Sequence, residues 1–448
     1  MSDTAVPDSP WAAPPQAAPA QPQPDGMQVE FTGRRWPLFW LALKTGFFTI
    51  LTLGFYRFWM KTRLRRWYWS AIRPGGHPLE YVGDPLEKLL GFFIAVVVLT
   101  FYIGIVNLLL MFVSFSVFNS SWLGYLASFA GVIPIWFYAR YRARRYVLAR
   151  TRWRGVRFGL EKGAWGYAGR ALVHWAVTIL TLGILWPRMT FALEKYRTDR
   201  TFFGSARLVQ QGRWQMLYRA ALPFIAVVIA GMALVLWILV IDPITPDLLS
   251  NPGSLPSRFV TALQLGRWPL GWESPERLWA VPVLMAGLVY GAIHYRWVAK
   301  RIMANHKAAY GVTFASRLQG PRIAMIYTLG TFISYLVLVL GIALLVVLSI
   351  AMYGPTAWLE GANAAGLGGL GNLPRWLSFG ILGVIYLSVF LLWGVLHNTF
   401  VTFPIMRHMA RTTTLPTTAG LQAISQRDRD AFAEAEGFAE ALDLGAAI

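Results

Sequence analysis

The stretch Thr49-Ile50-Leu51-Thr52-Leu53-Gly54 occurs a second time, letter for letter, as Thr178-Ile179-Leu180-Thr181-Leu182-Gly183. Residues that follow the phrase recur at the same offset, as Met60 does in Met189 and Leu64 does in Leu193. An identity of this length at one fixed offset indicates an internal duplication. We therefore expect a chain built from tandem units.

The composition predicts an integral membrane protein. Apolar residues make up 56% of the chain and charged residues only 14%, whereas about a quarter of the residues of a soluble protein are charged. The formal net charge of +20 is typical of basic loops on the cytoplasmic side of a membrane. We expect anionic lipid headgroups, and not nucleic acid, to face these loops. The absence of cysteine excludes disulfides and thiolate metal sites.

Six segments are apolar enough to cross a bilayer as helices. They are Leu90 to Phe115, Trp122 to Tyr138, Ala220 to Ile241, Leu278 to Tyr295, Ile323 to Met352 and Trp376 to Leu396. The two segments that carry the duplicated phrase are shorter, because Lys44 and Arg57 flank one of them and Arg170 and Arg188 flank the other. The sequence thus predicts an all-α integral membrane protein, with about six transmembrane helices and two shallow or re-entrant helices arranged as tandem repeats.

The charge of the loops predicts the orientation. The connections at 140–170 and 188–219 are both strongly basic, so we expect both on the cytoplasmic side, together with the two chain termini. The tripeptides Val29-Glu30-Phe31, Val156-Arg157-Phe158 and Val312-Thr313-Phe314 each introduce a unit. On this basis we expect membrane repeats at 29–155 and 156–311 and a divergent third repeat at 312–415. A disordered Pro/Ala-rich tail (1–28) precedes them and an acidic cytoplasmic tail (416–448) follows.

Two basic stretches resemble a known family. Phe31-Thr32-Gly33, the first TILTLG phrase, the run FYRFWMKTRLRRWY at 55–68 and the run YVLARTRWRGVRF at 146–158 are similar to the YjgN family of uncharacterised bacterial inner-membrane proteins. The resemblance implies a multipass protein of the bacterial inner membrane, and it lends no catalytic residue. The second copy departs from the first, since Pro187 and Glu194 stand where Phe58 and Arg65 stand in the first.

Basic residues at the ends of the inward-going helices are the candidate site. Ten of them form the predicted lipid- or anion-binding set: Arg63, Arg65, Arg66, Arg140, Arg142, Arg144, Arg145, Arg296, Lys300 and Arg301. One interpretation is that they only set orientation and anchor the protein to headgroups. The other is a site for a phosphate-bearing lipid or anion, held by the planar fork of arginine. Lys44 and His174 hold near-equivalent positions in the two short helices, where they either lie at the interface or form a polar lining.

We expect binding rather than catalysis. The six histidines are scattered, which gives no reason to expect a metal or another cofactor, and no Ser/His/Asp spacing indicates a nucleophile. The predicted function is a non-enzymatic membrane protein that binds or organises anionic lipid or an unknown membrane protein partner. The alternative is a transporter or channel for an anionic or amphipathic solute, and a membrane enzyme that acts on lipid is a third hypothesis.

Overall fold

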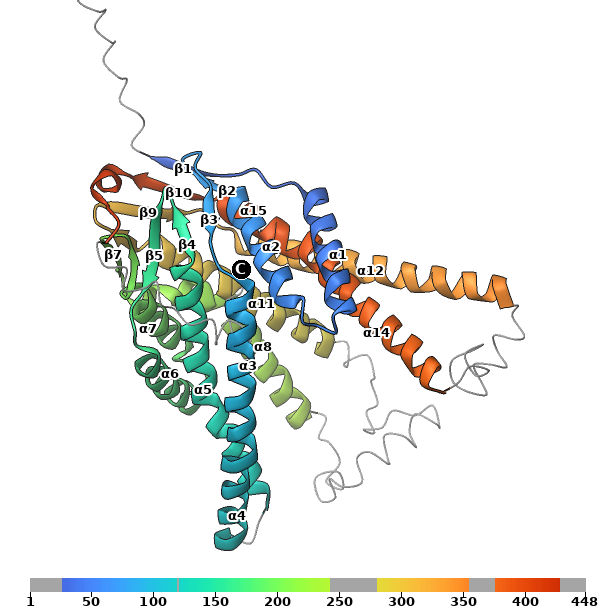
Figure 1. The fold of residues 1–448 in the computed structure, drawn as a ribbon. Helices are drawn as coiled ribbons and strands as arrows, with labels where there is room; N and C mark the ends of the chain where they lie inside the picture. The colour runs from blue at the N-terminus through green and yellow to red at the C-terminus, as the bar shows by residue number, and fades with distance from the viewer. Residues whose placement is uncertain (1–25, 119–120, 242–279, 354–374, 428–448) are drawn as a thin grey trace, which may run out of the picture.

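The computed structural model describes residues 26–118, 121–241, 280–353 and 375–427. Ten short strands form one antiparallel sheet in the order β2-β1-β10-β9-β8-β7-β6-β5-β4-β3 (Figure 1). They are β1 (Met27–Phe31), β2 (Ile72–Pro74), β3 (Leu79–Tyr81), β4 (Thr151–Trp153), β5 (Val156–Leu160), β6 (Thr201–Phe203), β7 (Ala206–Gln210), β8 (Lys307–Ala309), β9 (Val312–Ser316) and β10 (Thr413–Thr417). Strands β2 and β3, at the two ends of this order, follow one another in the chain, so the sheet curls into a nearly closed barrel.

Each pair of strands brackets a pair of helical segments. The helices are α1 (Arg35–Leu51), α2 (Arg57–Ala71), α3 (Pro85–Phe101), α4 (Asn107–Phe118), α5 (Ser121–Ala149), α6 (Ala164–Leu180), α7 (Trp186–Thr198), α8 (Tyr218–Ile241), α11 (Ala280–Ala304), α12 (Gly320–Tyr353), α14 (Arg375–His397) and α15 (Phe403–Arg411). Short π- or 3₁₀-helical pieces are η1 (Tyr102–Val106), η2 (Trp214–Leu217), η6 (Asn398–Thr402) and η7 (Ala419–Ala423). The described chain therefore runs through five successive strand–helix–helix–strand segments. β1 pairs with β10 and brings the first and last of them together.

Tight turns join these segments into β-hairpins. In the turn between β4 and β5, Arg154 and Gly155 have φ of 51° and 78°, and in the turn between β8 and β9, Tyr310 and Gly311 have φ of 44° and 78°. Two successive residues with positive φ are typical of type I′ turns, whose twist matches that of paired strands. The boundaries expected at 155/156 and 311/312 fall within these two turns.

The duplicated phrase ends two helices in the same way. After α1, the Gly54 amide donates to the Thr49 carbonyl at 2.7 Å, and the Leu53 amide donates to the Ile50 carbonyl at 2.9 Å. After α6, Gly183 and Leu182 repeat these two bonds. This is the Schellman pattern, with a left-handed leucine (φ 51° and 50°) in place of the usual glycine. Each phrase thus forms the tip of a helical hairpin, α1–α2 or α6–α7.

The expectation of an all-α fold is wrong, because ten strands form the sheet described above. The strands are only three to five residues long, so the alternation of side chains that marks a strand has too few positions to stand out beside long apolar helices. The V-x-F tripeptides are the clearest case. They lie in β1, β5 and β9, where alternate residues face the same side of the sheet.

The number of expected spans is also corrected. Within the described residues, four helical stretches are long and apolar enough to cross a membrane: Pro85–Val117, Trp214–Leu234, Gly320–Leu344 and Tyr386–Arg411. The segments expected at Trp122 to Tyr138 and Leu278 to Tyr295 lie along α5 and α11, which are not among these four, and residues 278 and 279 lie outside the described part. The long helix pairs extend away from the sheet, whereas α1–α2 and α6–α7 are short (Figure 1).

The expected tails lie mostly outside the described residues. β1 begins at Met27, inside the segment 1–28 that was expected to be disordered. Residues 416–427 of the expected acidic tail are folded, since they include the end of β10 and the turn of η7. Residues 428–448 are outside the described part of the chain.

Candidate anion-binding site

A cavity of about 780 Å³ opens between α2 and α11. Its wall is completed by residues of α12, α14, η6 and α15. Of the lining residues that the structure describes, five are basic and none is acidic; the basic ones are Arg57, Lys61, Arg65, Arg296 and Lys300. A single-signed, partly enclosed surface of this kind concentrates anions.

The basic side chains of α2 lie on one stripe of that helix. Arg57, Lys61 and Arg65 are spaced four residues apart, which places them on the same face. Arg65 is buried, with 5% of its surface exposed. Its guanidinium donates to the Tyr81 hydroxyl at 3.2 Å. Tyr81, in β3, therefore fixes the inner end of the stripe against the sheet.

Helix α11 presents an apolar and a cationic part to the same cavity. Val289, Ala292 and Ile293 line it first, and Arg296 and Lys300 follow one and two turns later. The Lys300 ammonium lies 4.2 Å from the centre of the Trp297 ring, a cation–π contact. Along α11 the cavity thus changes from a hydrocarbon wall to a positively charged one.

A second cavity, of about 450 Å³, lies between α1 and α14. Apart from Thr49, Arg57 and Asn398, its lining is apolar, with Ile50, Leu53 and Phe390 among it. The two cavities share four lining residues, namely Arg57, Met60, Leu64 and Asn398. They therefore meet at Arg57, which places a cation at the junction of an apolar space and a basic one.

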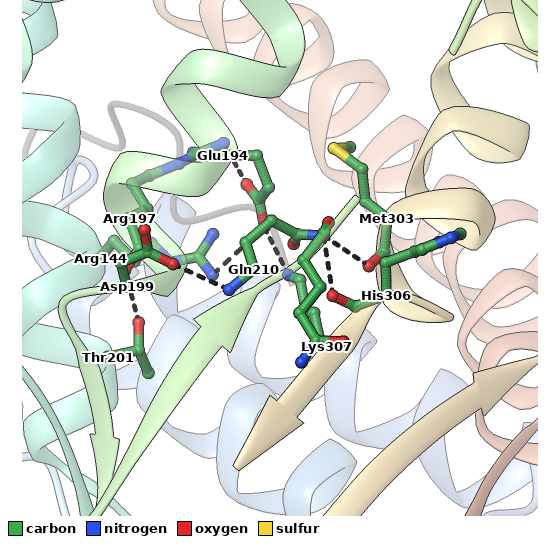
Figure 2. A network of polar contacts seen from close by, with 10 residues as sticks. Arg144, Glu194, Arg197, Asp199, Thr201, Gln210, Met303, His306 and Lys307 are labelled. Atoms are coloured by element: carbon green, nitrogen blue, oxygen red, sulfur yellow. Dashed lines mark hydrogen bonds and ion pairs between the residues drawn. The ribbon is translucent and has the colours of Figure 1, made fainter. Parts of the chain in front are cut away.

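A cluster of ionised side chains borders Lys300 on the side of α5 and α7. Figure 2 shows Glu194 of α7 between Arg197 and Lys307. One Glu194 oxygen accepts from the Lys307 ammonium at 2.7 Å, and the same oxygen lies 4.0 Å from the Arg144 guanidinium. Burial alone would raise the pKa of Glu194, but Lys307, Arg197 and Arg144 together hold it well below its usual value. Glu194 is therefore ionised at neutral pH.

The charges of this cluster extend into the cavity. Arg140 interacts electrostatically with both Arg296 and Glu194, and Lys300 interacts with Arg296, Glu194 and Arg144. The cavity wall desolvates Lys300, and Arg296 repels its charge, so that its pKa is lowered from 10.5 to about 8. Among the described residues, Glu194 is the acidic residue that acts on Arg140, Arg144 and Lys300.

Gln210 holds the elements of this cluster together. Its side-chain amide donates to the carbonyls of Met303 at 3.0 Å and His306 at 3.2 Å, and its backbone amide donates to Asp199 at 2.8 Å (Figure 2). These bonds join the end of α11 to β7 and α7. Gln210 is 2% exposed, and buried amides need such partners. We assign this residue a structural role.

A family model for bacterial proteins of unknown function, DUF898, matches residues 26–352. The chain belongs to this family. The match confirms the resemblance to YjgN-type proteins noted above. The matched range begins just before β1 and ends within α12, so α14, α15 and β10 lie beyond it. No curated protein and no solved structure matches the chain.

In this DUF898 protein, three of the ten expected site residues line the basic cavity: Arg65, Arg296 and Lys300. Arg140 and Arg144 lie in the cluster with Glu194. Arg142 and Arg145 line a different hollow, which faces the start of α6. Arg301 donates to the Leu318 carbonyl at 3.2 Å. The structure thus places the ten expected site residues in several separate parts of the fold.

The remaining expected residues lie outside the cavity lining. Arg63 is exposed and stacks on Tyr56, with 5.7 Å between its guanidinium carbon and the ring centre, and Arg66 donates to the Gly83 carbonyl at 3.0 Å. Lys44 is exposed on α1, and His174 is half-buried on α6. Sequence reasoning missed Arg57 and Lys61. The spacing of four residues between Arg57, Lys61 and Arg65 could have pointed to them. The density of charge along the sequence did not.

Within the described residues, no group of three or more His, Cys, Asp or Glu side chains is placed to hold a metal ion. The polar groups that line the cavity between α2 and α11 include the five cations, the amide of Asn398, and the side chains of Tyr327, His397 and Thr402. Guanidinium and ammonium groups donate hydrogen bonds and attract negative charge. This set is suited to bind a phosphate or a carboxylate.

Proposed function

We propose that this protein binds an anionic amphiphile, such as a phosphate-bearing membrane lipid. The headgroup lies between α2 and α11, against Arg57, Lys61, Arg296 and Lys300, and the hydrocarbon part lies in the cavity between α1 and α14. The observation that carries the proposal is the junction at Arg57 of an apolar cavity and a basic cavity whose described lining residues include no acidic one. A small inorganic anion would use only the first of these.

The membrane setting supports this role. Four described helices are long and apolar enough to cross a bilayer, and the two short hairpins end in exposed leucines, with Leu53 84% and Leu182 93% exposed. Large exposed apolar side chains mark contact with lipid or a partner. We place the protein in the bacterial inner membrane, with the sheet and both termini in the cytoplasm and the leucine tips within the inner leaflet.

The expected contribution of the basic residues follows from their number. One basic residue close to an anionic surface contributes about 1 kcal/mol, so the loss of two should cost about 2 kcal/mol. This corresponds to about a 30-fold loss of affinity, since 1.4 kcal/mol is a factor of ten.

The proposal is tested by counting bound lipids with native mass spectrometry. Full-length protein is released from membranes that contain phosphatidylglycerol and phosphatidylcholine, and the wild type is compared with the double variant Lys61→Gln/Lys300→Gln. The control is Arg63→Gln/Arg213→Gln, which removes the same charge from exposed positions outside the cavity lining. We expect the cavity variant to lose phosphatidylglycerol about 30-fold and the control to keep it. Equal retention by the two variants would reject the site and leave only a general electrostatic attraction.

A further inference from the structure

The inner face of the ten-stranded sheet lines a further cavity, separate from the two described above. A cavity of about 310 Å³ lies there, and every one of the ten strands contributes at least one residue to its lining. Thr413 has the one hydroxyl in this lining, and that hydroxyl already donates to the Met409 carbonyl at 2.8 Å. The Trp153 indole donates to the His77 carbonyl at 3.3 Å. The described part of the wall therefore offers hydrocarbon and aromatic surface and no free hydrogen-bonding side chain.

The size of the cavity follows from the number of strands and the small inward residues. Side chains just fill a barrel of about eight strands, and a wider one keeps internal space. Cross-strand partners on the inner face include Leu79 with Trp153 and Phe158 with Phe203, but also the small Ala309 with Val312. An engineered apolar cavity of about 150 Å³ excludes water and binds benzene. The space in this sheet is about twice as large, and it is only partly enclosed.

One wall of the cavity comes from the chain after β10. Leu421 of η7 and Ile424 line it. Hydrogen bonds attach this segment across the barrel end. The Ser205 amide donates to the Ser425 carbonyl at 2.8 Å, the Ser425 amide donates to the Ser205 hydroxyl at 3.3 Å, and the Arg157 amide donates to the Gln426 side chain at 2.9 Å. The other walls are hydrogen-bonded strands and helix α15. Residues 418–426 are thus the part of the wall that can move at the lowest cost.

We propose that the interior of the sheet is a binding site for a hydrocarbon group, either an acyl chain or a free apolar molecule, which enters beneath residues 418–426. The site is separate from the proposed anion site and does not depend on it. The two cavities share Met406 of α15 as a lining residue, so this helix is the wall between them.

Photolabelling of the full-length protein in nanodiscs tests the proposal. Two probes are used separately: adamantyl diazirine as a free apolar solute, and a phosphatidylcholine with a diazirine at the end of one acyl chain. Labelled peptides are then identified by mass spectrometry. We expect one or both probes to modify the inner strands and the segment with Leu421, and the probe that does so identifies the source of the hydrocarbon. Labelling confined to the membrane helices with both probes would overturn the proposal.

Two variants on one strand provide a matched comparison. Ala309→Leu adds a side chain to the cavity lining, whereas Ala308→Leu adds the same group on the opposite face of β8. Labelling of the inner strands should fall at least tenfold in the first variant and stay unchanged in the second. If Ala309→Leu does not fold, competition by unlabelled dodecane in the wild type replaces it. The competitor should remove the label from the inner strands and leave it on the membrane helices, and equal loss at both places would contradict the site.

Discussion

Replacement of Glu194 by glutamine should destabilise the protein more than any other single loss of a described carboxylate. Its side chain is 12% exposed, and those of its partners Arg197 and Lys307 are 18% and 19% exposed. Breaking such a buried pair leaves uncompensated cations and costs about 3 to 5 kcal/mol. Arg144, 4.0 Å away and 35% exposed, adds little because water screens it. Since all the partners keep some contact with water, we expect a loss of about 3 kcal/mol.

The measurement is denaturant-induced unfolding in detergent, followed by circular dichroism. The control is Glu87→Gln, because Glu87 also bonds an arginine, Arg150 at 2.7 Å, but is 40% exposed. Exposed pairs contribute about 1 kcal/mol or less. The double variant Glu194→Gln/Lys307→Met should lose less than the sum of the two single variants, because it removes both partners of one pair.

The dependence on pH gives an independent check. The pKa of Glu194 is lower in the folded protein than its ordinary value of 4.5, so its stabilisation is fully present above about pH 4.5 and is lost as the pH falls through the folded-state pKa. Glu194→Gln should remove this part of the acid sensitivity. If Glu194→Gln and Glu87→Gln are equally stable, or if the acid sensitivity is unchanged, the cluster does not hold the fold in the way described.

Three further results are expected. Binding of phosphatidylglycerol should weaken between about pH 7 and about pH 9.5, as Lys300 loses its proton near its pKa of about 8; Lys300→Arg should bind equally at both, and parallel curves would exclude Lys300 from the site. A spin label at Leu182→Cys, in this cysteine-free chain, should be more accessible to oxygen than to a water-soluble nickel complex, and the reverse would place the α6–α7 tip in water. Cysteines at Arg144 and Arg200 should both resist an impermeant reagent from the periplasm, whereas labelling of either would contradict the proposed orientation.

Sequence reasoning located the turns better than it classified the elements. The duplicated phrase marks two hairpin tips with the same hydrogen bonds. Two of the expected unit boundaries, 155/156 and 311/312, lie at β-hairpin turns, whereas 28/29 and 415/416 lie inside β1 and β10. The sheet was missed because each strand is short and pairs with residues distant in the chain, as Met27 pairs with Leu415. Pairing between residues so far apart in the chain leaves no pattern in the local sequence. The dipeptides Arg154-Gly155 and Tyr310-Gly311, each between alternating side chains, were the available hairpin signal.

The sequence showed where basic residues are dense, but not which of them line one cavity. Arginine density suggested an anion site, and Arg65, Arg296 and Lys300 do line one cavity. Which other basic residues join them depends on how α2 and α11 face each other across the fold, and these helices belong to the first and fourth strand–helix–helix–strand segments. The role of Glu194 could not be read from the sequence either. It replaces Arg65 in the second copy, and only the fold reveals that it offsets the charge of three neighbouring cations.

The central claim, an amphiphile held between α2 and α11, is tested most directly by a cryo-electron microscopy structure of the protein in nanodiscs that contain phosphatidylglycerol. We predict headgroup density within hydrogen-bonding distance of Arg57, Lys61, Arg296 and Lys300, continuous with chain density between α1 and α14. A cavity that is empty at a resolution where other lipids are visible, or closed by direct contact of α2 with α11, would contradict the account.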